Sequence, residues 1–224
     1  MNVMSVREAL AARHSSRTYK QEAVPRDVLV RIVEAATRAP SWGNTQPWEV
    51  FVAAGDTMNA IRNVFLENMQ NQVAPNPEYS PIEGWPEHIL QRYTDRVAAL
   101  CASIGVDPAD PAGQKAAAEG QMAFFGAPAA IFLCSHPGLE PWSLFDLGLL
   151  AQGIMLGAVE EGLSTIPAYS SVSYPDVLRQ QLEIPGEYKI VLGIAIGYED
   201  KDSPVNACRS ERRPIDEVLR IKGA

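Results

Sequence analysis

The chain alternates between stretches with apolar residues at helical spacing and short continuous apolar runs. Ser5 and Glu8 form a capping-box pattern, which predicts a helix from Ser5 to about Arg13. After Pro25, apolar residues recur every three or four positions, which predicts a second helix with one buried face. Further helices are predicted to begin at Gly55 and to cover about 87–103, 112–124, 143–162 and 175–182.

Three apolar runs rich in β-branched and aromatic residues predict core strands. They cover 48–53, 129–135 and 188–197, and the last run is the strongest of the three. The final 25 or so residues hold several arginines and a short amphipathic end at 215–221. We expect one domain that spans residues 1–224, because single domains commonly reach this size.

The helix predicted from Ser143 is almost entirely apolar or small. Ser143 is expected to be its N-cap, with Asp146 in the acidic third position. Several glycines lower its helix propensity, so we expect a neighbouring helix or a symmetry mate to approach its backbone closely. Its apolar part, 144–159, is interrupted by Asp146 and Gln152 and is expected to be too short to span a bilayer.

A long connection separates the third and fourth helices. The range 70–86 holds four prolines and shows no helical period. Loops of this length are commonly lids or binding loops, although a solvated insertion has the same composition. We therefore treat about 70–110 as a lid or insertion.

Charge and cysteine content exclude several classes of protein. The formal net charge is −8, and no run of lysine and arginine is long enough to follow a nucleic-acid backbone, so nucleic acid is not an expected partner. The N-terminus mixes Arg7 and Glu8 and lacks the apolar region of a signal peptide, so we expect a cytoplasmic protein without a membrane partner. The three cysteines are too widely spaced for a disulfide framework or a metal site, and Cys134 is expected to be buried.

Two polar stretches stand out as candidates for chemistry. Residues 13–17 place two guanidiniums and two hydroxyls directly after a helix, a combination that suits a phosphate group, although basic residues also complement the end of a helix dipole. The stretch 39–48 combines prolines, a glycine, short polar side chains and two tryptophans. It could present these groups to a planar heterocycle, or it could be an ordinary helix-to-strand turn.

Four separated patterns together resemble the nitroreductase family, the FMN-dependent NAD(P)H oxidoreductases. They are RHSSR at 13–17, APSWGNTQPW at 39–48, the small-residue helix followed by GLSTIPAYSS at 162–171, and a tail with RSERRPIDEV at 209–218. The likeness covers nearly the whole chain. FFGAP at 124–128 and the proline-rich insertion are most similar to the branch of nitrobenzoate and dinitroaniline reductases.

The resemblance implies an α+β fold, with a central, mostly antiparallel sheet of four strands wrapped by helices. It also implies an intertwined homodimer in which the C-terminal segment, about 199–224, crosses to the partner and completes its sheet. Three predicted strands are few for a chain of this size, and the apolar tail has no obvious place in one subunit, which agrees with such an exchange. Two FMN molecules would lie at the dimer interface.

The resemblance also assigns site residues. Those matching positions at the FMN phosphate, ribityl chain and ring are Arg13, His14, Ser15, Arg17, Pro40, Ser41, Asn44, Gln121, Ala168, Tyr169, Ser170 and Arg212. Many relatives carry Glu-Gly where this chain has Tyr169 and Ser170, and Ser210 replaces a common lysine, for which Arg209 could substitute. Candidates to sandwich an aromatic acceptor are Trp42, Tyr79, Trp85 and Phe124, although such aromatics are more often packing residues.

The implied reaction passes hydride from NAD(P)H through FMN to a nitroaromatic or quinone-like acceptor in ping-pong turnover. The cofactor carries the hydride chemistry, so no catalytic nucleophile or acid–base pair is expected, and Arg17 would be an electrostatic stabiliser at the pyrimidine edge. Without a second arginine cluster for a 2′-phosphate, NADH or dual use is favoured. The alternatives are reductive dehalogenation or flavin-fragmenting synthesis at the same site, or a non-catalytic flavin-binding dimer.

Overall fold

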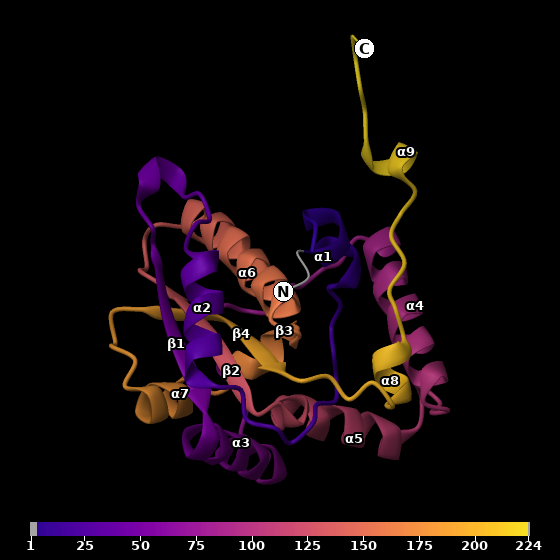
Figure 1. The fold of residues 1–224 in the computed structure, drawn as a ribbon. Coiled ribbons are helices and arrows are strands. Elements are labelled where there is room, and N and C mark those ends of the chain that lie inside the picture. The colour runs from indigo at the N-terminus through magenta and orange to yellow at the C-terminus, as the bar shows by residue number, and fades with distance from the viewer. Residues whose placement is uncertain (1–3, 224) are drawn as a thin grey trace.

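The computed structural model describes residues 4–223 and shows one four-stranded sheet between two layers of helices (Figure 1). The elements, in chain order, are α1 (Val6–Ala12), α2 (Arg26–Ala36), η1 (Trp42–Asn44), β1 (Trp48–Ala54), α3 (Gly55–Gln70), α4 (Glu87–Ser103), α5 (Pro111–Met122), η2 (Phe124–Gly126), β2 (Ala129–Ser135), α6 (Trp142–Glu160), β3 (Ser164–Ala168), η3 (Tyr169–Val172), α7 (Pro175–Leu182), β4 (Lys189–Gly197), α8 (Pro204–Ala207) and α9 (Ile215–Val218). The α+β class and the antiparallel sheet are as predicted.

The sheet has the strand order β1-β2-β4-β3, and every neighbouring pair is antiparallel. Side chains of β2 alternate between the two faces. Phe132 and Cys134 pack in the core with α3 and α7, whereas Ile131 and Leu133 pack in the core with α2 and α6. Cys134 is fully buried, as predicted, and burial raises the pKa of its thiol to about 12.

The four-stranded sheet implied by the family resemblance is confirmed, whereas the apolar runs alone indicated three strands and missed β3. Strand β3 has only five residues, one of which is Pro167, so its apolar strand pattern in the sequence is weak. Proline is tolerated here because β3 lies at the edge of the sheet. The outer side of this strand is partly covered, since the backbone N–H of Ser16 donates to the carbonyl of Thr165 over 3.1 Å.

Helix α6 differs from the sequence expectation at its start. It begins at Trp142 with Pro141 as N-cap, so Ser143 lies inside the helix and the predicted N-cap was wrong. Asp146 instead accepts a hydrogen bond from the backbone N–H of Trp42 in the loop before β1, at 3.1 Å.

The predicted close approach to α6 is confirmed and involves α2. A Cβ placed on Gly153 would lie 3.2 Å from the Cα of Ala36, and one on Gly157 would lie 3.5 Å from the side chain of Ile32. At Gly148 the space is open, so no contact among residues 4–223 explains that glycine.

Helix α6 is long and apolar enough to cross a membrane by length and composition, which corrects the expectation that its apolar part is too short. The same helix buries eight residues, among them Leu147, Leu150 and Ile154, against α2 and the sheet. It is therefore the core helix of this fold.

The C-terminal tail lies outside the layered body (Figure 1). Segment 71–86 has no helix or strand, as predicted, and leads into α4, which lies beside α8 and the start of the tail (Figure 1). Beyond α8, the tail extends away from the body and carries only the short helix α9. Exposed apolar side chains follow its length, namely Ile215, Val218, Leu219 and Ile221.

A substitution at Gly193 in β4 can test how tightly the sheet packs against η3. A Cβ added there would lie 2.5 Å from the Cβ of Ser171 and 3.2 Å from the ring of Phe132. We expect Gly193→Ala to lower the free energy of unfolding by about 1–3 kcal/mol, measured by urea denaturation, because a rigid contact must open. Gly186→Ala is the control, since a Cβ there meets nothing within 4 Å. Equal stability of the two variants would contradict this packing.

Candidate functional site

Residues 13–17 form a connection between the end of α1 and the outer edge of β3. Ser16 is fully buried, and its hydroxyl lies 2.5 Å from the hydroxyl of Ser164 at the start of β3. Together with the backbone bond to Thr165, this contact fixes the stretch along the strand. Arg13, Ser15 and Arg17 are each only partly exposed.

His14 is held by contacts within the chain. Its Nδ1 lies 2.8 Å from the carbonyl oxygen of Ala12, and its Nε2 lies 2.6 Å from a carboxylate oxygen of Glu199. The two side chains are 17% and 12% exposed, so this contact lies largely inside the protein. His14 therefore orients the 13–17 stretch against the segment that follows β4.

Asn206 in α8 fixes the backbone at Arg17. Its Oδ1 accepts from the backbone N–H of Arg17 at 2.6 Å, and its Nδ2 lies within 2.9 Å of three oxygens, two of Thr18 and one of Asp200. The side chain is 2% exposed. Sequence analysis did not identify Asn206, because a single asparagine far along the chain gives no signal of this contact.

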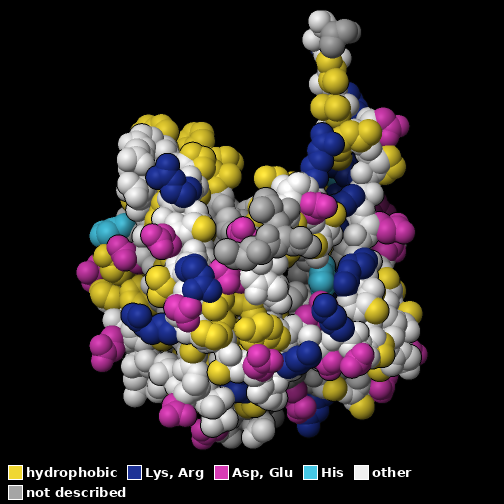
Figure 2. Space-filling model, viewed as in Figure 1, with side chains coloured by type: hydrophobic (Ala, Val, Ile, Leu, Met, Phe, Trp, Pro, Cys, Tyr) yellow, Lys and Arg dark blue, Asp and Glu magenta, His cyan; other side chains and the backbone are white. Residues whose placement is uncertain are grey.

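The guanidinium of Arg17 is partly buried and has a second cation near it. Burial, and secondarily the charge of Arg96, lower the pKa of Arg17. Among residues 4–223, Arg17 forms no ion pair. Arg96 projects from α4, where one of its nitrogens lies 3.1 Å from the Sγ of Cys208. Lys and Arg side chains gather over α4, α8 and the start of the tail (Figure 2).

The 39–48 stretch folds into a tight loop around η1. Gly43, Asn44 and Gln46 have positive φ angles of 59°, 56° and 46°, which explains the glycine and the short polar residues. The hydroxyl of Ser41 accepts from the backbone N–H of Gln46 at 2.9 Å, which braces the loop internally. Pro40, Asn44 and Trp42 are exposed, and the Trp42 side chain has 70% of its surface accessible.

These two stretches lie at opposite ends of α6. The 39–48 loop is bound to Asp146 in the first turns of the helix, whereas the 13–17 stretch is bound to Ser164, just after the helix ends at Glu160. Between Asp146 and Glu160 the helix rises about 21 Å at roughly 1.5 Å per residue. One chain therefore does not bring the two stretches together.

The predicted ring-facing segment lies at the end of β3. Ala168 and Ser170 are buried, and Tyr169 is exposed. The hydroxyls of Ser170 and Ser171 are buried without a hydrogen-bond partner among the described residues. Unsatisfied buried hydroxyls are uncommon, and at this position they indicate a place where a bound group can supply the missing bonds.

The first part of the 70–86 loop is anchored to the body. The carboxylate of Glu78 accepts from Arg179 at 2.5 Å and from the backbone N–H of Ile190. The Tyr79 carbonyl accepts from the hydroxyl of Tyr169 at 2.7 Å. The hydroxyl of Tyr79 in turn donates to Glu140. Two tyrosine hydroxyls therefore join the loop to the rest of the site. Burial and this bond raise the pKa of Tyr79.

Four remaining candidates occupy different surroundings. Trp85 is 38% exposed and stacks on Tyr93, with ring centroids 5.8 Å apart. Gln121 is exposed near the end of α5, and Arg212 lies in the tail, where its side chain donates to backbone carbonyls of its own segment. The assignment of Phe124 to the acceptor site was wrong, because its side chain is fully buried against other core phenylalanines and cannot stack on an acceptor.

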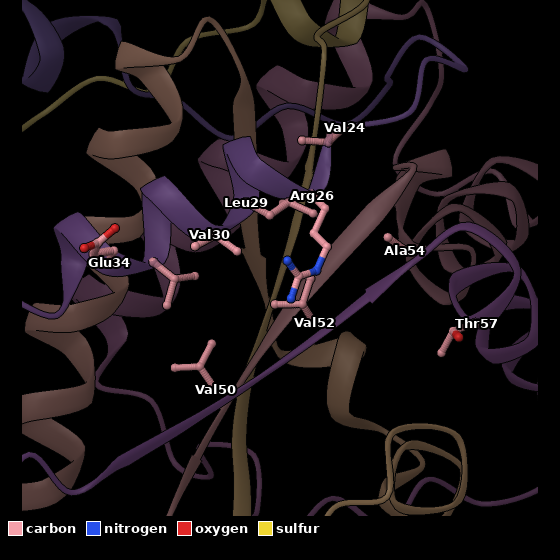
Figure 3. Close-up of a pocket in the computed structure, with 10 residues that line it drawn as sticks. Val24, Arg26, Leu29, Val30, Glu34, Val50, Val52, Ala54 and Thr57 are labelled. Atoms are coloured by element: carbon pink, nitrogen blue, oxygen red, sulfur yellow. The ribbon is translucent and has the colours of Figure 1, made fainter.

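A groove runs between α2 and the free edge of β1. It encloses about 840 Å³ and is lined mainly by valines, including Val30, Val50 and Val52, with Arg26 and Glu34 as charged members. Figure 3 shows the side chains of Val30, Val50 and Val52 directed into the space between helix and strand. Within residues 4–223, no group of three or more His, Cys, Asp or Glu could hold a metal ion.

Comparison with known proteins agrees with this architecture. The model of the nitroreductase family matches residues 10–198. The chain is 28% identical over 218 residues to a 4-nitrobenzoate reductase from Pseudomonas putida, an alignment that covers 96% of this chain and 94% of that protein.

Solved structures show the same fold over nearly the full length. The FMN- and NADPH-dependent nitroreductase NfnB from Sphigopyxis sp. strain HMH superimposes with a TM-score of 0.93 at 33% identity and covers 99% of this chain and 100% of that one. The FMN-dependent nitroreductase NfnB from Mycobacterium smegmatis, in complex with NADPH, gives 0.91 at 25% identity and covers 96% and 97%. The chain therefore belongs to the nitroreductase family.

Proposed function

We propose that this protein is an FMN-dependent oxidoreductase that passes hydride from NAD(P)H to a nitroaromatic or quinone-like acceptor by a ping-pong mechanism. The observation that carries the proposal is the partly buried guanidinium of Arg17, which has no ion-pair partner among residues 4–223 and whose backbone is fixed by Asn206. A buried cation without a counter-ion is costly, and an organic phosphate supplies the missing charge. Family relatives named for FMN and NADPH support the choice of cofactor and donor.

The residues present fit the phosphate of FMN. Arg13, Ser15 and Arg17 offer two guanidiniums and a hydroxyl from one fixed stretch. Arg96 adds a further positive charge from α4. Planar guanidiniums bind phosphate oxygens in pairs, which suits this arrangement better than isolated ammonium groups would.

The ring of the cofactor would be shared between two subunits. In one chain, Pro40, Ser41 and Asn44 lie near the start of α6, whereas residues 13–17, which we assign to the phosphate, lie near its end. A second copy related by a two-fold axis can place its 39–48 loop opposite the Ala168–Ser170 segment of the first. The unpartnered hydroxyl of Ser170 would then have a bonding partner at the cofactor. We propose a homodimer with two such sites and a cytoplasmic location.

The chain's own residues orient and shield the reaction. When bound, FMN carries hydride from the nicotinamide to the acceptor. Arg17 supplies positive charge beside the pyrimidine edge of the cofactor. Trp42, Tyr79 and Trp85 offer flat surfaces to an aromatic acceptor and exclude water. The donor and the acceptor use the same face in turn, which gives ping-pong kinetics.

Dehalogenation of an amino-acid substrate is disfavoured by the state of Glu78. Such a reaction requires charged groups in the lid that bind a zwitterion. Glu78 is the most enclosed carboxylate of the 70–86 loop, and both of its oxygens are taken by Arg179 and the backbone of Ile190. It anchors the loop and is not available to a ligand's amino group.

The apolar groove along β1 suits the C-terminal tail of a second subunit. Leu219 and Ile221 are 49% and 66% exposed in the extended tail, and Val52 on the free edge of β1 is 37% exposed. A free strand edge offers unpaired backbone groups that an incoming extended segment can bond. We therefore propose that residues after α8 cross to the partner and occupy this groove, bringing Arg212 to the partner's side of the interface.

The reaction is tested on the purified protein reconstituted with FMN under anaerobic conditions. We expect NADPH to bleach the visible flavin absorbance and 4-nitrobenzoate or nitrobenzene to restore it, with parallel lines in double-reciprocal plots. A two-electron turnover consumes one NADPH and one proton and yields one nitroso product and one water. Flavin that stays oxidised with both NADPH and NADH would overturn the nicotinamide-linked mechanism.

Arg17→Ala and Asn206→Ala separate direct binding from positioning. Loss of the guanidinium should weaken FMN binding by about 10- to 100-fold, because a hydrogen bond to a charged group contributes about 1.5–3 kcal/mol. Asn206→Ala should weaken it by less and should also lower the unfolding temperature, since four partly buried hydrogen bonds are lost. Equilibrium dialysis and thermal denaturation measure the two effects. The controls, Arg92→Ala and Asn59→Ala, replace exposed residues of the same types.

Removal of residues 209–224 tests the exchanged tail. We expect the truncated chain to shift toward monomer in sedimentation velocity and to expose the β1 edge. Val52→Asp should have a similar effect by placing a charge in the groove, whereas Val73→Asp, at an exposed valine outside it, should not. A truncated chain that remains a dimer of unchanged stability would contradict the exchange.

A further inference from the structure

A small cavity opens beside the 39–48 loop, at the start of α6. Its volume is about 220 Å³, and its walls include the indoles of Trp42 and Trp142 and the side chain of Leu139. A cavity of roughly 150 Å³ can hold benzene, so this one is large enough for a substituted aromatic ring. Both indoles are more than half exposed in the single chain and so are free to contact a flat molecule.

The floor of this cavity is polar and incompletely satisfied. Ser143 is 2% exposed, and its hydroxyl has no hydrogen-bond partner among the described residues. Asp146 is 3% exposed and accepts one bond, from the backbone N–H of Trp42. Buried polar atoms normally find partners, so the floor offers a hydroxyl and carboxylate oxygens to a ligand.

Both charged residues that line the cavity, Glu140 and Asp146, are acidic, and the charge of Lys189 acts on Glu140 from outside this lining. Glu140 lies at its rim, where the hydrogen bond from Tyr79 is the main cause that lowers the pKa of this carboxyl, so Glu140 is ionised at neutral pH. No lysine, arginine or histidine lines the cavity. The nearby Lys189 ammonium lies over the ring of Tyr79, 5.1 Å from its centroid. A second anion in this space would be repelled, whereas a hydrogen-bond donor would be bound.

Two of the residues assigned to the acceptor converge on the cavity. Trp42 forms one wall and stands between Ser41 and Asn44, which we assign to the cofactor ring. Tyr79 holds the rim residue Glu140. An acceptor stacked beside the ring at this loop would therefore extend its far end toward Ser143 and Asp146.

We propose that the cavity binds the substituted end of the acceptor and selects neutral substituents that donate hydrogen bonds, such as a primary carboxamide, over a carboxylate. This specificity rests on the proposed nitroreductase function and narrows its substrate class. A carboxamide can donate an N–H to Asp146 and accept at its carbonyl oxygen from the Ser143 hydroxyl, whereas a carboxylate can only accept and lies near two negative charges.

The test compares two nearly isosteric acceptors, 4-nitrobenzamide and 4-nitrobenzoate, on the FMN-loaded dimer. We expect kcat/KM to be at least 10-fold higher for the amide. Glu140→Gln keeps an acceptor for Tyr79 but removes the charge, and should lower this ratio about 3- to 10-fold by raising the value for the carboxylate. Ser143→Ala should lower the ratio by reducing the value for the amide. Ser103→Ala, at the end of α4, is the matched control and should leave the ratio unchanged.

Binding of benzamide and benzoate, which cannot be reduced, gives the second measurement. Calorimetry on the wild-type holoenzyme should show tighter binding of benzamide, and this result does not require any variant to fold. Equal affinity together with equal kcat/KM, or a ratio that neither variant changes, would overturn the proposal. If nitrobenzene itself is not reduced with NADPH, the proposed function fails, and the benzamide comparison still decides whether the cavity has this selectivity.

Discussion

The close packing of α6 on α2 is the constraint on which the rest of the structure depends. Gly153 and Gly157 let the two helix backbones approach, and the pair covers one face of the sheet. The same helix holds the 39–48 loop at its start through Asp146 and leads at its end to the strand that carries residues 13–17. Its length sets the spacing between the two stretches that we assign to the cofactor, and in the proposed homodimer a second subunit would bring them together.

A second constraint is the position of positive charge in an acidic protein. Burial of a guanidinium costs several kcal/mol unless an anion accompanies it. Arg17 is nevertheless partly buried, and Asn206 fixes its backbone with a set of hydrogen bonds that also order the start of the tail. Folding thus holds the Arg17 guanidinium partly buried before an anion binds, and a binding site for phosphate requires such preorganisation.

Local sequence patterns predicted the elements that depend on local physics. The capping box of Ser5 and Glu8 and the apolar periods of the strands are present as predicted. The sequence could not place Arg96 or Asn206, because their contacts join segments far apart in the chain. Phe124 was misassigned because the sequence pattern around an aromatic side chain is the same in a core as in a substrate site. The two-subunit arrangement rests on the family resemblance, since the structure describes one chain.

The polarity of the site follows from these two constraints together. Basic residues gather where 13–17 meets α4 and the tail, whereas Glu140 and Asp146 lie at the other end of α6. In a two-fold dimer, the cationic end of one subunit would face the acidic end of its partner, with the ring of the cofactor between them. A molecule that spans this boundary would place its anionic group on the arginines and a neutral, hydrogen-bond-donating group toward Asp146. Attraction at one end and repulsion at the other would thus orient both cofactor and acceptor.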